Sequence, residues 1–157
     1  MAGDPIELLG WRRRMFELYR EVRASHDPEE AWELWRDVRD ELFATHPQSP
    51  VPEEDRKDFT GLAYFDYDLG ARTVAVVHRV KRETLEMTGS AGSAYEMVRF
   101  GVARFELYGQ ARELEVYWID VYGGGVFLPF RDATSGDQTY GGGRYLLDTI
   151  KGADLGS

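Results

Sequence analysis

A glycine-rich loop in the C-terminal part of the chain holds residue types that could bind an anion. Arg131 and Arg144 flank this loop, and hydroxyl side chains and glycines lie between them. Backbone amides exposed at glycines, hydroxyl groups and guanidinium groups can together donate several short hydrogen bonds to one anion. A guanidinium suits a carboxylate or a phosphate because its planar fork donates two parallel bonds. The predicted site for a small anionic or polar ligand comprises Arg131, Thr134, Ser135, Tyr140, Gly142 and Arg144.

A purely structural role would explain the same loop. Its glycines can adopt the positive φ that a tight connection requires, and Arg131 can pair with the adjacent Asp132. The sequence contains neither Gly-x-x-x-x-Gly-Lys-Ser/Thr nor Gly-x-Gly-x-x-Gly, the two common nucleotide-binding patterns. We therefore expect no nucleotide cofactor, and the binding and structural interpretations of the loop both stay open.

A second cluster that could do chemistry contains His46 and Ser49. In a hydrolase, His46 would serve as the base for Ser49 or Ser135, and Asp132 would orient the histidine. The sequence has no Gly-x-Ser-x-Gly motif, which holds a nucleophilic serine at a strained turn in one large class of hydrolases. Alternatively, His46 caps the preceding helix by donating to its last carbonyl groups. The hydrolase hypothesis is therefore second to the binding hypothesis.

Cysteine and histidine usage argues against a metal cofactor. The chain has no cysteine, which excludes disulfides, thiolate metal sites and thiol nucleophiles within this sequence. Its three histidines, His26, His46 and His78, are far apart and form no closely spaced pair. We expect neither a metal nor any other cofactor.

The overall charge restricts the possible partners. Among 157 residues, 28 are acidic and 19 are basic, giving a formal net charge of −9. Such a surface repels phosphate backbones and anionic lipid, so we expect neither nucleic acid nor a membrane as partner. No apolar run approaches the roughly 18 residues that span a bilayer, and no secretory leader is evident at the N-terminus. The expected compartment is the cytoplasm.

The first 44 residues should form a helical hairpin. Two Asp-Pro pairs, at Asp4 and Asp27, each offer an N-cap, a proline at the first helical position and a glutamate three residues after the cap. Apolar residues follow each pair at steps of three and four, which predicts one buried stripe per helix. The predicted stripes are Leu8, Trp11, Met15, Leu18 and Val22, then Ala31, Trp32, Leu34, Trp35, Val38 and Leu42.

After a proline-rich linker at residues 45–58, the apolar period changes to two, which predicts strands separated by glycine-rich turns. A change of apolar face near Ala103 predicts a bulge or a bend there. A long strand covered on both faces would also explain the change, but we favour the curled sheet. We therefore predict an α+β fold in one domain, residues 1–157, with the hairpin packed on a curled, barrel-like antiparallel meander over residues 59–157. The predicted strands are Leu62–Tyr67, Thr73–Arg82, Leu85–Thr88, Glu96–Tyr108, Glu113–Tyr122, Val126–Phe130 and Tyr145–Ile150.

Five segments of the chain carry a family resemblance: His46–Pro50, Phe59–Phe65, Arg99–Leu107, Leu128–Gly136 and Thr139–Tyr145. Together they resemble the bacterial and archaeal family known as domain of unknown function 1684. The resemblance covers most of the chain from about Trp11 onward and implies no reaction. Members of this family continue beyond this point with a cysteine-bearing, proline-rich tail, whereas this chain ends at Ser157, as a truncated or a naturally short form.

The sequence thus predicts a non-enzymatic module that binds a small anionic or polar molecule at the Arg131–Arg144 loop. The alternatives are a hydrolase and a structural or protein-interaction module, the latter using aromatic residues of the hairpin or an open edge strand. Because the absent tail would leave such an edge unpaired, we also expect self-association, most simply as a homodimer.

Overall fold

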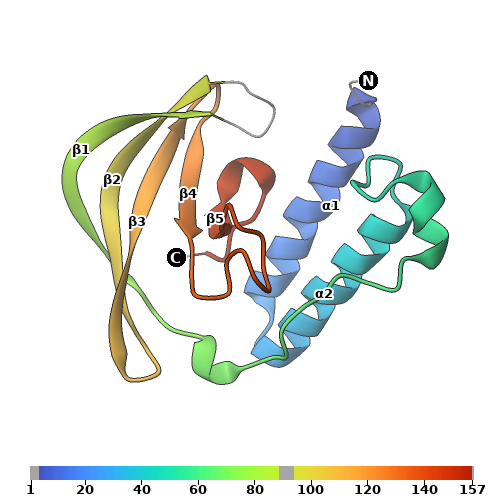
Figure 1. The fold of residues 1–157 in the computed structure, drawn as a ribbon, viewed down its shortest axis with the longest axis horizontal. Coiled ribbons are helices and arrows are strands. Elements are labelled where there is room, and N and C mark those ends of the chain that lie inside the picture. Colours follow the sequence, from blue (N-terminus) through green and yellow to red (C-terminus); the bar gives the residue numbers. More distant parts are fainter. Residues whose placement is uncertain (1–3, 89–93, 157) are drawn as a thin grey trace. The chain divides into compact units, whose positions relative to one another are not determined.

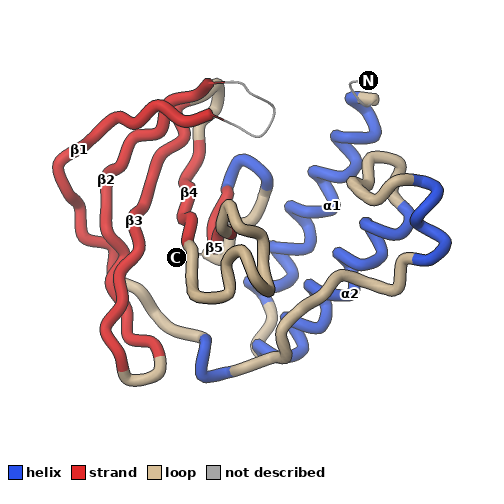
Figure 2. Tube along the Cα trace, in the orientation of Figure 1, coloured by secondary structure: helices blue, strands red, loops and turns tan. Residues whose placement is uncertain are grey.

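The computed structural model describes residues 4–88 and 94–156, and this part of the chain divides into two compact units. The first unit runs as far as Leu69 and includes the chain end from Leu155, and the second unit spans Gly70–Asp154. Helices dominate the first unit and an antiparallel sheet forms the second (Figure 1 and Figure 2). The predicted α+β class is therefore confirmed. The expected organisation as one domain stays a prediction.

The helical hairpin consists of α1 (Pro5–Ala24) and α2 (Pro28–Thr45). Asp4 caps α1 by accepting a hydrogen bond from the amide of Ile6 at 2.8 Å. Asp27 caps α2 in the same way, by accepting from two amides of its first turn. Both helices therefore begin where the Asp-Pro pairs predict, because the carboxylates satisfy amides that have no partner within the helix.

The apolar stripes of the two helices supply the buried residues of the hairpin. Leu18 is completely buried, whereas Leu8, at the start of the predicted stripe, is 43% exposed. Trp35 is half-buried, and its indole N–H donates to the hydroxyl of Tyr19 at 3.1 Å. No helix in the described part of the chain combines the length and apolar character needed to cross a membrane. The buried hairpin residues are Met15, Leu18, Tyr19, Ala31, Val38 and Leu42.

The segment after the proline-rich linker differs from the prediction. The linker contains a 3-10 helix, η1 (Glu53–Asp58), and Leu62–Tyr67 forms no strand. Instead, Asp40 of α2 accepts hydrogen bonds from the amide of Leu62 at 2.9 Å and the hydroxyl of Tyr64 at 3.3 Å. The strand predicted from the alternating apolar residues of Leu62–Tyr67 is therefore wrong. A segment that packs along a helix also buries alternate side chains, so the same pattern fits both structures.

Five strands form the sheet, and each pairs antiparallel with the next along the chain, which makes a meander. Two predicted strands, Thr73–Arg82 and Leu85–Thr88, form one continuous strand, and the last predicted strand gives way to a 3-10 helix after Asp148. The turn predicted at residues 89–92 lies outside the described residues. The elements are η2 (Leu69–Ala71), β1 (Val76–Thr88), β2 (Ala94–Leu107), β3 (Gln110–Asp120), β4 (Gly125–Phe130), β5 (Arg144–Asp148) and η3 (Thr149–Lys151).

The sheet is curled but does not close into a barrel (Figure 1). Its core lies on one face, where Ala103, Val116 and Leu128 are buried side by side. The β2–β3 turn has Tyr108 and Gly109 at φ 49° and 72°, as a two-residue type I′ hairpin turn requires. β1 and β5 are the edge strands of the described sheet. Self-association through such an edge stays a prediction.

Candidate functional site

The pairing of β1 with β2 is irregular at one point. The register changes from Arg79 opposite Gly101 to Glu83 opposite Arg99. The three residues of β1 between Arg79 and Glu83 therefore lie opposite a single residue of β2, Phe100. Irregularities of this kind bend a strand and change the direction in which its side chains point.

The pairing of β2 with β3 is irregular at the same residue. Gly101 lies opposite Val116, whereas Arg99 lies opposite Tyr117, the next residue of β3. Phe100 is therefore an extra residue in β2, and its bulge meets the irregularity of β1. Two bulges in one place strongly curl the sheet locally, and bulges are frequent beside binding sites.

These irregularities bring two arginines into one pocket. On a regular strand, residues three positions apart project to opposite faces. Arg79 and Arg82 nevertheless line the same pocket, because the extra residues between them re-aim the second side chain. Gly101 allows a close approach at this crossing, since a Cβ there would lie 2.9 Å from Cγ1 of Val77.

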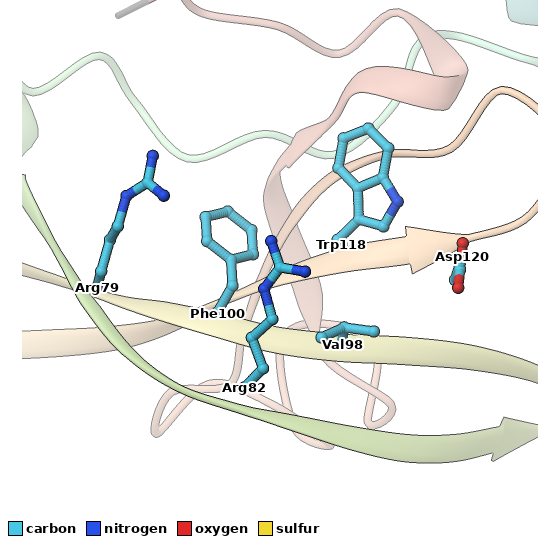
Figure 3. Close-up of a pocket in the computed structure, with 6 residues that line it drawn as sticks. All are labelled: Arg79, Arg82, Val98, Phe100, Trp118 and Asp120. Carbon is cyan, nitrogen blue, oxygen red and sulfur yellow. The ribbon is translucent and has the colours of Figure 1, made fainter.

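The pocket has a cavity volume of about 360 Å³. In Figure 3, Phe100 stands between Arg79 and Arg82, Trp118 lies beyond Arg82, and Asp120 lies at the end opposite Arg79. Trp118 is 40% exposed, so the indole offers apolar surface to a bound molecule. The lining residues are Arg79, Arg82, Val98, Phe100, Trp118 and Asp120.

The charged side chains of the pocket are available for a ligand. Within residues 4–88 and 94–156, the side chains of Arg79, Arg82 and Asp120 form neither hydrogen bonds nor ion pairs. Two guanidinium groups and one carboxylate give the lining an excess of positive charge on an acidic protein. The arrangement can bind an anionic group with bidentate hydrogen bonds while Phe100 and Trp118 cover an apolar body.

Side chains within the glycine-rich loop between Arg131 and Arg144 hold the loop together by an ion pair and hydrogen bonds. Arg144 pairs with Asp132 at 2.5 Å, donates to the hydroxyl of Thr134 at 3.2 Å and lies over the ring of Phe130. The amide of Asp132 in turn donates to the hydroxyl of Ser135 at 3.2 Å. Three predicted ligand residues are thus brought together, but Asp132 neutralises the guanidinium that would hold the anion.

The remaining predicted ligand residues lie at the surface of this loop. Tyr140 is 75% exposed, and its ring lies close to Gly142. Arg131 is also exposed, and its methylene groups lie against Gly143. An anion at this loop would have to displace Asp132 from Arg144, so the anion site predicted here stays a prediction.

The ion pair within the loop makes an acid-dependent contribution to stability. The hydroxyl of Thr134, its amide and the charge of Arg144 lower the pKa of Asp132 from its ordinary value of 3.8. A group whose pKa is lower in the folded state contributes stability above its unfolded pKa and loses it as the pH falls through the folded pKa. The melting temperature of the wild type should therefore fall below about pH 4, and Asp132→Asn should reduce this fall.

Thermal unfolding followed by circular dichroism between pH 5 and about pH 2 measures this difference. Asp137→Asn, at an exposed position in the same loop, removes the same charge and should leave the slope unchanged. Equal slopes for the wild type and the Asp132→Asn variant would contradict the assigned role of the carboxylate.

The residues of the hydrolase hypothesis make structural contacts. His46 accepts a hydrogen bond at Nδ1 from the amide of Gln48 at 3.1 Å, and its ring meets Trp11 edge-on. The hydroxyl of Ser49 donates to the carbonyl of Phe43 at 2.5 Å, which satisfies a free carbonyl at the end of α2. It is therefore Ser49, with the backbone amide of His46, that caps this helix end. Catalysis by this cluster stays a prediction.

Sequence reasoning missed the pocket in the sheet. Its one signal was the change of apolar face along β2, from which we expect a bulge near Ala103. The structure has the bulge at Phe100 instead. The partner irregularity in β1 could not be found, because it depends on pairing across strands. Within the described ranges 4–88 and 94–156, no group of three acidic or histidine side chains is arranged to hold a metal.

Comparison with known proteins supplies the family. No functionally curated protein matches the chain. One solved structure that matches is the solution NMR structure of an uncharacterized protein from Haloarcula marismortui, 35% identical in sequence, with a TM-score of 0.49. The match covers 74% of this chain and 66% of that one. The family model described as "Protein of unknown function (DUF1684)" matches residues 57–157, and the chain therefore belongs to the DUF1684 family.

Proposed function

We propose that the protein is a non-enzymatic binding module that takes a small organic anion into the pocket of its sheet. The observation that carries this proposal is the coincidence of two bulges at Phe100, which turns Arg79 and Arg82 to one face. Unpaired guanidinium groups repel each other, and an anion between them relieves this repulsion while accepting up to four hydrogen bonds.

The ligand carries an apolar or aromatic body besides its anionic group. Phe100, Trp118 and Val98 form the apolar part of the lining, and a phosphate or sulfate ion alone would leave this surface uncovered. The cavity volume of about 360 Å³ lies at the small end of the range for small-molecule sites. Benzoate, a planar ring with one carboxylate, is the simplest probe that uses both features.

Isothermal titration calorimetry with benzoate tests the proposal. The double variant Arg79→Gln/Arg82→Gln should bind benzoate at least about tenfold more weakly than the wild type, because it loses two charge-assisted donors. The control is Arg12→Gln/Arg13→Gln, which makes the same charge change at exposed positions of α1 and should bind as the wild type does.

The same titrations separate this pocket from the loop predicted by the sequence. Arg144→Lys keeps the charge but loses the bidentate fork, and it should leave benzoate binding unchanged. If Arg144→Lys loses binding and the Arg79/Arg82 variant keeps it, the anion site is the loop between Arg131 and Arg144. If the wild type binds no benzoate at millimolar concentration, the proposal is wrong.

A further inference from the structure

Three carboxylates lie side by side across the sheet next to the pocket. Glu86 of β1 pairs directly with Glu96 of β2, and Glu96 pairs directly with Asp120 of β3. Directly paired residues project to the same face of a sheet, so the three side chains form one row. Like charges in such positions destabilise a sheet. Within the described residues, none of the three forms an ion pair that would offset this cost.

This row lies at the end of the pocket opposite Arg79. Asp120 is two residues beyond Trp118 on β3, so both project to the same face, and Asp120 itself lines the pocket. Figure 3 shows Arg79 at one end, Asp120 at the other, and Phe100 and Trp118 between them. Arg82 stands between Phe100 and Trp118 in the same view, so the two arginines occupy the half of the pocket away from Asp120, and the negative charge occupies the opposite end.

A divalent metal is not the natural occupant of the negative end. The three carboxylates are not arranged as a metal-holding group, and no other such group occurs in the described ranges. Spread across three strands, they instead produce a negative potential along one rim of the pocket, which attracts a single cationic group on a larger molecule.

We infer that the pocket takes a zwitterion, with an acidic group at Arg79 and Arg82, an apolar or aromatic centre against Phe100 and Trp118, and a protonated amine at Asp120. This inference rests on the proposed function and adds the second charge of the ligand. A molecule with only the anionic group leaves the carboxylate row unpaired, whereas a zwitterion of this polarity matches both ends. Charge complementarity of this kind mainly provides specificity.

Two probes of nearly the same shape test the inference. 4-(Aminomethyl)benzoate carries a protonated amine opposite its carboxylate, and 4-ethylbenzoate replaces that amine by a methyl group. Calorimetry should show that Asp120→Asn weakens binding of the aminomethyl compound by about threefold to fivefold, the upper part of the range for an exposed charge pair. Binding of 4-ethylbenzoate should not weaken, because that compound has no cationic group that could pair with Asp120.

Asp137→Asn is the matched control, since it makes the same charge change at an exposed residue of the Arg131–Arg144 loop. It should affect the two probes equally. The selective loss in Asp120→Asn should also shrink as salt screens the pair. If Asp120→Asn changes both probes by the same factor, the inference is wrong while the anion pocket stands. If neither probe binds the wild type, the proposed function itself fails.

Discussion

Replacing Leu18 with Ala should lower the free energy of unfolding of the helical hairpin by about 2–5 kcal/mol. Leu18 is completely buried, on the face of α1 that holds Met15 and Tyr19. The substitution removes apolar contacts and leaves a cavity that the surrounding helices can fill only in part. Urea unfolding followed by helical circular dichroism gives the change in free energy.

Leu8→Ala provides the control on the same helix. Leu8 is 43% exposed, so its truncation removes much less buried surface and should cost below about 1 kcal/mol. Equal losses for the two variants would show that the completely buried position is not the centre of the hairpin core.

Replacing Gly143 with Ala should destabilise the sheet unit by about 2–4 kcal/mol. Gly143 has a φ of 95°, and a Cβ there would lie 2.7 Å from the carbonyl oxygen of Phe130. The cost therefore has two parts: an unfavourable backbone conformation and a clash with main chain that cannot move freely. Thermal unfolding monitored by Trp118 fluorescence, in a background with the three hairpin tryptophans replaced by Phe, reports on this unit.

Gly109→Ala separates the two parts. Gly109 also has a positive φ, 72°, but a Cβ there would meet no atom within 4 Å. This control should cost only the conformational part, about 1–2 kcal/mol. If the two alanine variants lose the same stability, the close approach of Phe130 contributes nothing.

Local signals were sufficient for the helices and for most strands. The Asp-Pro pairs at Asp4 and Asp27 fix the helix starts, because capping involves only neighbouring residues. Alternating apolar residues and glycine turns predict an antiparallel meander, because each hairpin of a meander joins strands that are neighbours in the sequence. Leu62–Tyr67 was wrongly predicted because its partner is Asp40, a residue more than twenty positions away. No local pattern indicates that contact.

The candidate site depends on contacts that the sequence does not show. Glycines and hydroxyls between Arg131 and Arg144 suggested a ligand loop, but Asp132 occupies the guanidinium of Arg144. The pocket arises from strand register instead, because only the pairing around Phe100 places Arg79 and Arg82 on one face. A one-residue change in that register would separate the arginines without changing any residue.

The most direct test of the anion pocket uses the four tryptophans of the chain as site-resolved probes. Trp118 lines the pocket, whereas Trp11, Trp32 and Trp35 lie in the helical hairpin. In nitrogen-15 NMR spectra, titration with benzoate should shift the indole N–H resonance of Trp118 and leave the other three in place. The shift should vanish in the Arg79→Gln/Arg82→Gln variant. A titration that moves only the hairpin resonances, or none of the four, would contradict the account.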